Sequence, residues 1–197
     1  QHIKRDRATS NICTAQVLLA VMAGMYAVYH GPKGLKYIAN KVHYTTVALA
    51  EALESLGFKL VHKSFFDTIQ VRVTENSNLK TIAEQKEVNF YYPDETTVSI
   101  SINETTTLSD LNLIISIFTE VYSKKTTQLQ VVSSNIRIPE TAQRHSEFMT
   151  NVIFNSHHSE TELMRYIKRL ERKDLSLNFS MISLGSCTMK LNAAVEM

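Results

Sequence analysis

A short run near the end of the sequence carries the densest set of groups that could do chemistry. Between Gly185 and Lys190 the chain places a glycine, the hydroxyls of Ser186 and Thr188, the thiol of Cys187 and an amine. The run has neither the 3.6-residue period of a helix nor the two-residue period of a strand, so it predicts no regular element. Hydroxyl and ammonium donors suit a small carboxylate ligand. A polar surface loop is the alternative interpretation, because loops are polar by default.

A second group of candidates lies near the start of the chain. Thr9, Ser10 and Asn11 stand just before a long apolar run, where Thr9 or Ser10 can cap a helix. The start of a helix presents unpaired N–H groups and a partial positive charge, so the three residues are candidate phosphate contacts. A plain N-cap is the alternative. Cys13 and Cys187 are candidate redox thiols. Cys13 would lie in the first turn of that helix, where the helix dipole favours the thiolate. An inert, half-buried thiol is the alternative.

The histidines predict no metal site. His157 and His158 are adjacent, and neighbouring histidines on one backbone rarely bind the same ion unless further ligands stand at suitable spacing. His30 and His43 are isolated, and we expect them at a helix end and on the surface. The basic residues of the segment that follows, Arg165 to Arg172, are typical of a solvated helix face.

Two helices are expected at the start of the chain, separated by Gly31–Pro32. The first runs to about His30, and apolar residues surround it, which predicts a buried helix. Proline lacks the amide that would continue the helix, and glycine accepts a positive φ. The second helix covers about 33 to 56 and ends at Gly57, a favourable residue just beyond a helix C-terminus.

The middle of the chain changes to a strand period. Alternation of apolar and polar residues predicts strands over 58–62, 68–73, 88–92 and 97–102, with a short helix over 79–86 between the second and third strands. Thr107 and Asp110 resemble a capping box that opens a helix through Tyr122. This order predicts an α+β domain: a small antiparallel sheet with helices on one face.

The pattern dissolves after this helix. From Ser123 to Asn151 the chain is rich in Ser, Thr, Gln and Asn, which predicts a linker. Ser159 and Glu162 form the next capping-box pattern, and its helix extends to about Arg172. The expected organisation is therefore a domain over 1–122, a linker over 123–151, and a connector helix and arm over 152–197.

Composition excludes several classes. The net charge of +2 favours neither nucleic acid nor an acidic membrane, and 44% hydrophobic residues are typical of a soluble globular protein. The apolar run Val17–Tyr29 is too short to span a bilayer. Two cysteines make no disulfide framework, and the start has no signal-peptide pattern, so we expect an intracellular protein. The ends, Gln1 and Met197, suggest a piece of a longer polypeptide.

Four stretches carry a resemblance to a known family. They are Ala-Thr-Ser-Asn-Ile-Cys-Thr-Ala-Gln (8–16), Tyr-His-Gly-Pro-Lys-Gly-Leu (29–35), Phe-Asn-Ser-His-His-Ser-Glu-Thr-Glu (154–162) and Ser-Leu-Gly-Ser-Cys-Thr-Met-Lys-Leu-Asn (183–192). In this order they resemble the glycine cleavage system P-protein, a glycine decarboxylase that depends on pyridoxal 5'-phosphate (PLP). Two departures are visible: Ser183 stands where the family usually has Pro, and Asn151-Val152 where it usually has His-Pro.

The resemblance implies a fold and a reaction. Residues 1–122 would be the small C-terminal domain of a fold-type-I PLP enzyme, and 152–197 the arm that enters the catalytic half. The parent protein would decarboxylate glycine and pass the aminomethyl group to the lipoyl arm of H-protein. H-protein and the catalytic half would be its partners, a dimer is expected for the full-length enzyme, and the location would be cytoplasmic, or the mitochondrial matrix in a eukaryote.

The resemblance also assigns roles to residues. Thr9, Ser10 and Asn11 would contact the PLP phosphate, and Ser186, Thr188 and Lys190 would line the substrate side. The family's PLP lysine lies in a His-Lys-Thr context that is absent here, so we expect no catalytic residue and no bound cofactor in this chain alone. A non-catalytic regulatory or scaffold module with a degenerate PLP-enzyme small domain is the alternative function. A different fold-type-I decarboxylase is disfavoured by the four stretches together.

Overall fold

A computed structural model describes residues 16–125, 128–130 and 134–173 of the chain. The chain divides into two compact units, one of residues 34–146 and the other of residues 1–33 with 147–197. The long helix α1, Gln16–Ser55, contributes residues to both units.

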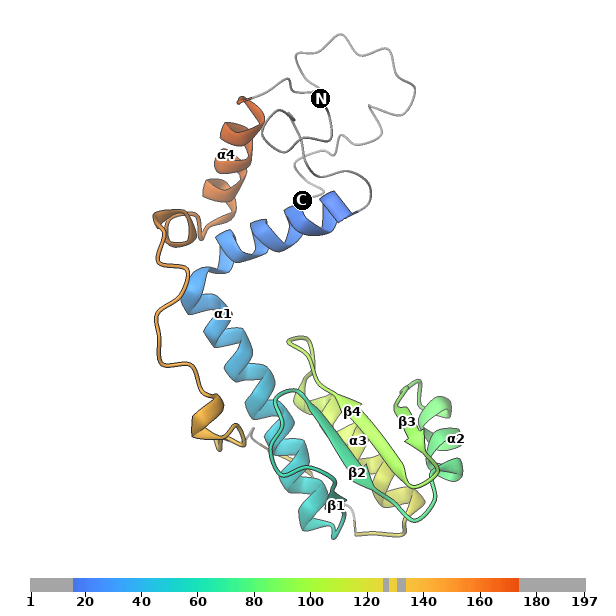
Figure 1. The fold of residues 1–197 in the computed structure, drawn as a ribbon. Helices are drawn as coiled ribbons and strands as arrows, with labels where there is room; N and C mark the ends of the chain where they lie inside the picture. The colour runs from blue at the N-terminus through green and yellow to red at the C-terminus, as the bar shows by residue number, and fades with distance from the viewer. Residues whose placement is uncertain (1–15, 126–127, 131–133, 174–197) are drawn as a thin grey trace, which may run out of the picture. The chain divides into compact units, whose positions relative to one another are not determined.

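The 34–146 unit is built on a small antiparallel sheet, as the sequence predicts. Its described strands follow the order β1-β2-β4-β3, with every neighbouring pair antiparallel. The strands are β1 (Lys59–Leu60), β2 (Thr68–Arg72), β3 (Tyr91–Asp94) and β4 (Thr97–Ser101). Helix α2, Ser77–Gln85, lies between β2 and β3 in sequence, and helix α3, Leu108–Val121, runs behind β2 and β4 in Figure 1.

Cross-strand pairing places the apolar residues of the sheet on one face. Ile69 pairs with Ile100 and Val71 with Val98, and all four side chains are at most 3% exposed. The core that they join also contains fully buried residues of α1 and α3: Leu49, Leu53, Leu111, Ile115 and Phe118. Burial of large aliphatic side chains at this level is the main stabilising contribution in a small domain.

Helix ends are fixed by local sequence. At the end of α1, Gly57 has φ 87, and the amides of Gly57 and Phe58 donate to the carbonyls of Glu54 and Leu53. This is the Schellman arrangement, in which a residue with positive φ closes the helix, so the prediction for Gly57 is confirmed. At the start of α3 both halves of the Thr107–Asp110 capping box are present.

One strand differs from its prediction. The third strand is expected over 88–92 and to end before Pro93, whereas β3 covers Tyr91–Asp94 and contains Pro93. Proline has no N–H to donate, so it is excluded from central strands but tolerated at an edge. β3 is an edge strand paired with β4, with a register irregularity between Tyr91 and Asp94.

The segment that follows α3 is attached to this unit by side-chain hydrogen bonds. The Asn112 side chain donates to the carbonyl of Leu129 and accepts from its amide, at 3.1 and 2.8 Å. Further along, Asn135 donates to Glu51, and Arg137 forms an ion pair with Glu54 at 2.9 Å. A 3₁₀ turn, η1, covers Glu140–Ala142. A segment without periodicity is thus held by specific polar contacts to helices.

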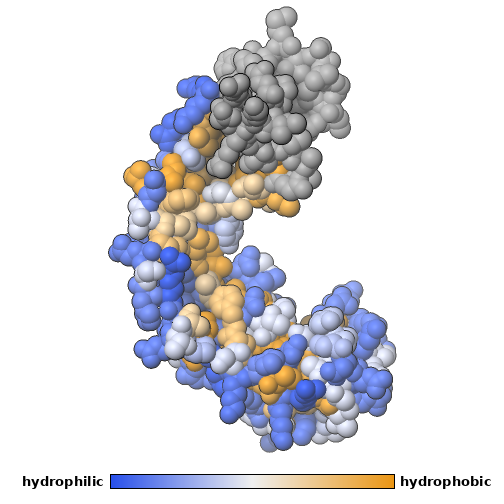
Figure 2. Space-filling view, viewed as in Figure 1, coloured by the Kyte–Doolittle hydropathy of each residue, from blue (hydrophilic) through white to orange (hydrophobic). Residues whose placement is uncertain are grey.

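The other unit contains the start of α1, a 3₁₀ turn η2 (Val152–Asn155) and helix α4 (Glu160–Glu171). Ser159 caps α4, and its hydroxyl accepts from the amide of Glu162. The expectation of a buried first helix is wrong for this chain: Leu18, Leu19 and Met22 are 65%, 67% and 58% exposed. Figure 2 shows apolar side chains on the surface of this helix. An all-round apolar helix is buried only where other elements cover it, and the described residues do not cover this face.

Candidate functional site

The sequence-predicted site residues cannot be placed in the fold. Thr9, Ser10, Asn11 and Cys13 lie outside the described residues, as do Ser186, Cys187, Thr188 and Lys190. Their proposed roles therefore stay predictions. The described residues do show what lies between these two groups along the chain, and which other clusters could do chemistry.

The break in α1 is a close contact with the segment before α4. Gly31 has φ 59 and ψ −177, a backbone conformation that is almost restricted to glycine. It is buried, and a Cβ at this position would lie 2.5 Å from the carbonyl oxygen of Phe154 and 2.6 Å from Cε1 of His158. Glycine is therefore required twice, by its backbone conformation and by its neighbours. The sequence predicts the helix break but gives no sign of the contact.

His158 completes this contact. Its Nδ1 atom lies 2.7 Å from the carbonyl oxygen of Tyr29, in the last turn before the break. A carbonyl oxygen only accepts, so Nδ1 carries the proton and donates. The helix is interrupted at Gly31, and the imidazole gives the carbonyl just before the break a donor from another segment.

His157 is held on the other side, by α4. Its ring stacks on Tyr166 with centroids 4.5 Å apart and an interplanar angle of 12°. Arg169 places Nη2 3.4 Å from His157 Nε2 and its guanidinium 5.7 Å from the Tyr166 ring centroid. The two adjacent histidines thus contact different helices. Among the residues that the structure describes, no group of three or more His, Cys, Asp or Glu side chains could hold a metal ion.

His43 is a structural residue rather than the surface histidine that the sequence suggests. It is 3% exposed and lies on the buried side of α1. Nδ1 donates to the carbonyl oxygen of Phe66 at 2.9 Å, and Nε2 accepts from the backbone N–H of Arg137 at 3.0 Å. Both ring nitrogens are satisfied in the neutral Nδ1–H tautomer. His43 therefore ties two irregular segments to one helix, a role that no local pattern reveals.

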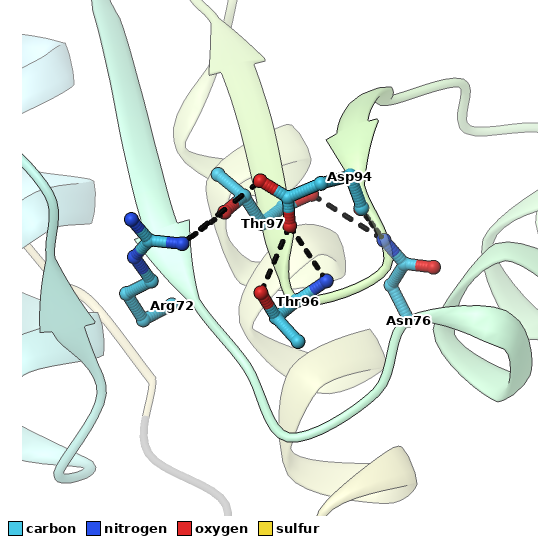
Figure 3. Close-up of polar contacts among 5 residues, drawn as sticks. All are labelled: Arg72, Asn76, Asp94, Thr96 and Thr97. Carbon is cyan, nitrogen blue, oxygen red and sulfur yellow. Dashed lines mark hydrogen bonds and ion pairs between the residues drawn. The ribbon is translucent and has the colours of Figure 1, made fainter.

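A polar cluster surrounds the turn between β3 and β4 (Figure 3). Asp94 accepts from the amide and hydroxyl of Thr96 at 2.8 and 2.9 Å, and Arg72 approaches Asp94 to 3.9 Å. The Thr96 backbone hydrogen bond is the main reason that the pKa of Asp94 lies below its usual value. The Asn76 amide donates to the carbonyl oxygen of Asp94 at 2.6 Å.

This cluster fits a structural role. Arg72 also donates to the Thr97 hydroxyl at 2.8 Å, so its guanidinium already has partners within the sheet. The side chains of Arg72 and Asp94 are each 52% exposed, and exposed ion pairs contribute little free energy. The contacts hold the hairpin turn and the start of α2 together.

An open hollow of about 420 Å³ lies beside the end of α1, with Lys59, Arg72 and Lys124 on its wall. Three cations could attract an anion. Lys124, however, lies over the Phe58 ring, 5.9 Å from its centroid. Arg72 already donates a hydrogen bond to the Thr97 hydroxyl. The hollow also adjoins Tyr122, whose pKa is raised to about 12 by burial and by Glu75. We assign no ligand to this hollow.

That this chain lacks the lysine that binds PLP stays a prediction, because the structure describes only part of the chain. A lysine that forms a covalent bond with PLP must be desolvated, but none of the described lysines is buried. Lys63, in a His-Lys-Ser sequence, is exposed in the loop before β2. Among the described helices, none is long and apolar enough to cross a bilayer.

Comparison with known proteins supplies the family. The sequence profile of the family described as glycine cleavage system P-protein matches residues 1–118. Glycine dehydrogenase (decarboxylating) of Christiangramia forsetii is 64% identical over 197 residues, all of this chain. The proteins of the same name from Flavobacterium johnsoniae and Bacteroides fragilis are 64% and 50% identical, again over the whole chain. The chain spans 21% of the length of each of these relatives.

The described residues define an α+β protein with a small four-stranded antiparallel sheet. The match over residues 1–118 and the 64% identity to two relatives establish its family. The chain belongs to the glycine cleavage system P-protein family.

Proposed function

We propose that the chain is an internal part of a PLP-dependent glycine decarboxylase. The full-length protein decarboxylates glycine and transfers the aminomethyl group to the lipoyl arm of H-protein. The observation that supports this best is the 64% identity, along the entire chain, to proteins named glycine dehydrogenase (decarboxylating). The antiparallel sheet and its helices are consistent with the small domain of a fold-type-I PLP enzyme.

The chain's contribution is binding and positioning. PLP, when bound, supplies the electron sink for decarboxylation. Thr9, Ser10 and Asn11 hold its phosphate at the start of a helix. Ser186, Thr188 and Lys190 face the substrate, where hydroxyl and ammonium donors orient the carboxylate of glycine. The lysine that binds PLP comes from the catalytic half, which together with H-protein is the expected partner. We further propose that the full-length enzyme is dimeric and cytoplasmic.

The test separates the two groups of residues in the full-length protein. Replacement of Thr9 and Ser10 together by Ala should weaken PLP retention by roughly 1–3 kcal/mol, because hydrogen bonds to a charged phosphate are lost. Ser186→Ala and Lys190→Ala should each lower kcat/KM for glycine about tenfold, or about 1.4 kcal/mol, with normal PLP content. Lys173→Ala, an exposed lysine just after α4, is the control for loss of a cation.

Two results would contradict the proposal. One is a full-length protein that binds PLP but releases no carbon dioxide from glycine in the presence of lipoylated H-protein. The other concerns the isolated chain, in which we expect neither PLP binding nor glycine turnover. A PLP absorbance that survives dialysis and disappears on borohydride reduction would show that the chain carries its own attachment point.

A further inference from the structure

The two predicted site segments are connected to the same small joint. Helix α1 begins at Gln16, shortly after Thr9–Asn11, and breaks at Gly31. Helix α4 ends at Glu171, ahead of Ser183–Asn192, and the segment just before it contacts the break. The joint therefore connects the two helices that the predicted site segments flank in sequence.

The joint is formed by backbone and side-chain contacts that fit closely. The Phe154 carbonyl faces Gly31 so closely that any Cβ would collide with it, and the His158 ring covers the same glycine. His158 donates to the Tyr29 carbonyl, while His157 stacks on Tyr166 of α4. Adjacent residues thus hold the end of one helix and the side of another.

The turn that presents Phe154 is itself braced. Asn155 donates to the carbonyl oxygens of Met149 and Asn151, both at 3.0 Å. The Asn151 side chain accepts from the amide of Ile153 at 3.0 Å, and Ser156 donates to the carbonyl of Val152 at 2.6 Å. A turn with this many internal hydrogen bonds keeps the Phe154 carbonyl in one place, so the joint has a defined geometry.

We propose that Gly31, Phe154 and His158 form a positioning joint, which fixes α1 and α4 relative to each other and so aligns the phosphate-binding and substrate-side segments of the full-length enzyme. These are positioning residues, since they act through the segments beyond each helix. The catalytic part of this inference rests on the proposed function. The structural part stands on the contacts alone.

The chain offers a matched pair of glycines for the structural test. Gly31→Ala should open the joint, because the new Cβ meets Phe154 and His158 and the backbone conformation is unfavourable for alanine. Gly24→Ala is the control in the same helix, since no described atom outside the helix's own neighbouring backbone lies within 4 Å of its Cβ position. We expect amide exchange at 29–33 and 153–158 to rise about tenfold in Gly31→Ala and to stay unchanged in Gly24→Ala.

A second pair tests the histidine if Gly31→Ala does not fold. His158→Asn places an amide nitrogen where Nδ1 stands and should keep the bond to Tyr29, whereas His158→Leu has similar size and no donor. Amide exchange at residues 29–33 should become faster in His158→Leu and stay unchanged in His158→Asn. In the parent, ¹⁵N NMR should show a protonated Nδ1 for His158. If the amide exchange rates in both Gly31→Ala and His158→Leu equal those of the parent, these residues do not form a joint.

The kinetic arm uses the full-length enzyme. Gly31→Ala and His158→Leu should lower kcat/KM for glycine about tenfold and weaken PLP retention, while Gly24→Ala and His158→Asn behave like the parent. If a variant loses amide-exchange protection at the joint but keeps the kcat/KM and PLP retention of the parent, the positioning role is wrong. If the parent enzyme itself does not turn over glycine, the proposed function fails, and the exchange experiment still decides the structural joint.

Discussion

The contacts inside the 34–146 unit differ in kind from the contacts inside the other unit. Among the described residues, the 34–146 unit contains a core of 18 buried apolar residues, which come from α1, α2, α3, the sheet and the residues next to them. In the described part of the other unit, Val28 is the one buried hydrophobic residue, and α4 buries none. There, a glycine without space for a Cβ and a histidine hydrogen bond provide the specific contacts.

The difference in magnitude is instructive. Burial of one leucine contributes about 1.5–3 kcal/mol, whereas a hydrogen bond contributes about 1 kcal/mol net. By these magnitudes we expect the core of the 34–146 unit to contribute far more stability than the few described polar contacts of the other unit. The exposed apolar residues of α1 agree with this division, because the chain spans 21% of its relatives' length and so leaves most of their surfaces outside.

The largest expected effect tests the core directly. Leu49 is fully buried, so Leu49→Ala should lower the free energy of unfolding by about 3 kcal/mol through lost burial and the cavity that remains. Leu19→Ala makes the same chemical change at a 67% exposed position of the same helix and should change stability by less than about 0.5 kcal/mol. Urea denaturation monitored by circular dichroism measures both. Similar losses in the two variants would break the comparison between the units.

An intermediate effect is expected where the long segment after α3 attaches to the core unit. His43→Leu should cost roughly 1–3 kcal/mol, because the Phe66 carbonyl and the Arg137 amide lose their partner in a buried place. His43→Asn, which keeps a donor near Phe66, should cost less. The Arg137 amide should lose exchange protection in both variants. If that amide stays protected, the segment is held by other contacts, such as the Arg137–Glu54 ion pair.

The helices, strands and caps follow from local sequence, whereas the contacts between distant segments do not. Alternation at 68–73 and 97–102 predicts β2 and β4, Gly57 predicts a helix end, and Thr107 with Asp110 predicts a cap, since each depends on neighbours within a few residues. The edge position of Pro93, the burial of His43 and the fit of Gly31 against Phe154 depend on partners far along the chain. The spacing of apolar residues along the chain does not identify partners that are distant in sequence.

The candidate site shows the same limit in another form. Thr9–Asn11 and Ser186–Lys190 are identified by residue type and by family resemblance, and their proposed roles stay predictions because they lie outside the described residues. In the sequence, His157 and His158 belong to a family stretch and form a pair that predicts no metal site, and neither observation indicates which segments they contact. Gly31–Pro32 predicts a helix end, where the last carbonyls lack intrahelical donors, but nothing in the sequence identifies His158 as the group that binds one of them.

The smallest effect concerns a helix cap of the core unit and its response to acid. Asp110 accepts from the amide of Thr107 at 2.8 Å, and this bond, followed by that from the Thr107 hydroxyl, lowers the pKa of the Asp110 carboxyl. A lowered folded-state pKa means that the unfolded chain binds the proton more tightly, so the stabilisation is present above the ordinary aspartate pKa of about 4 and is lost as the pH falls through the folded value. Thr107→Ala should cost about 1 kcal/mol at pH 7 and less at pH 3, which lies below the ordinary aspartate pKa, so that part of the stabilisation by the Asp110 carboxylate is lost. Asp67→Asn is the control, since the Asp67 carboxyl accepts from the Thr68 hydroxyl in a loop rather than at a helix cap. Thermal unfolding of the three proteins at both pH values measures the difference. An equal cost of Thr107→Ala at pH 7 and pH 3 would show that the hydroxyl alone caps α3, and that the stability of the core unit does not depend on this carboxylate.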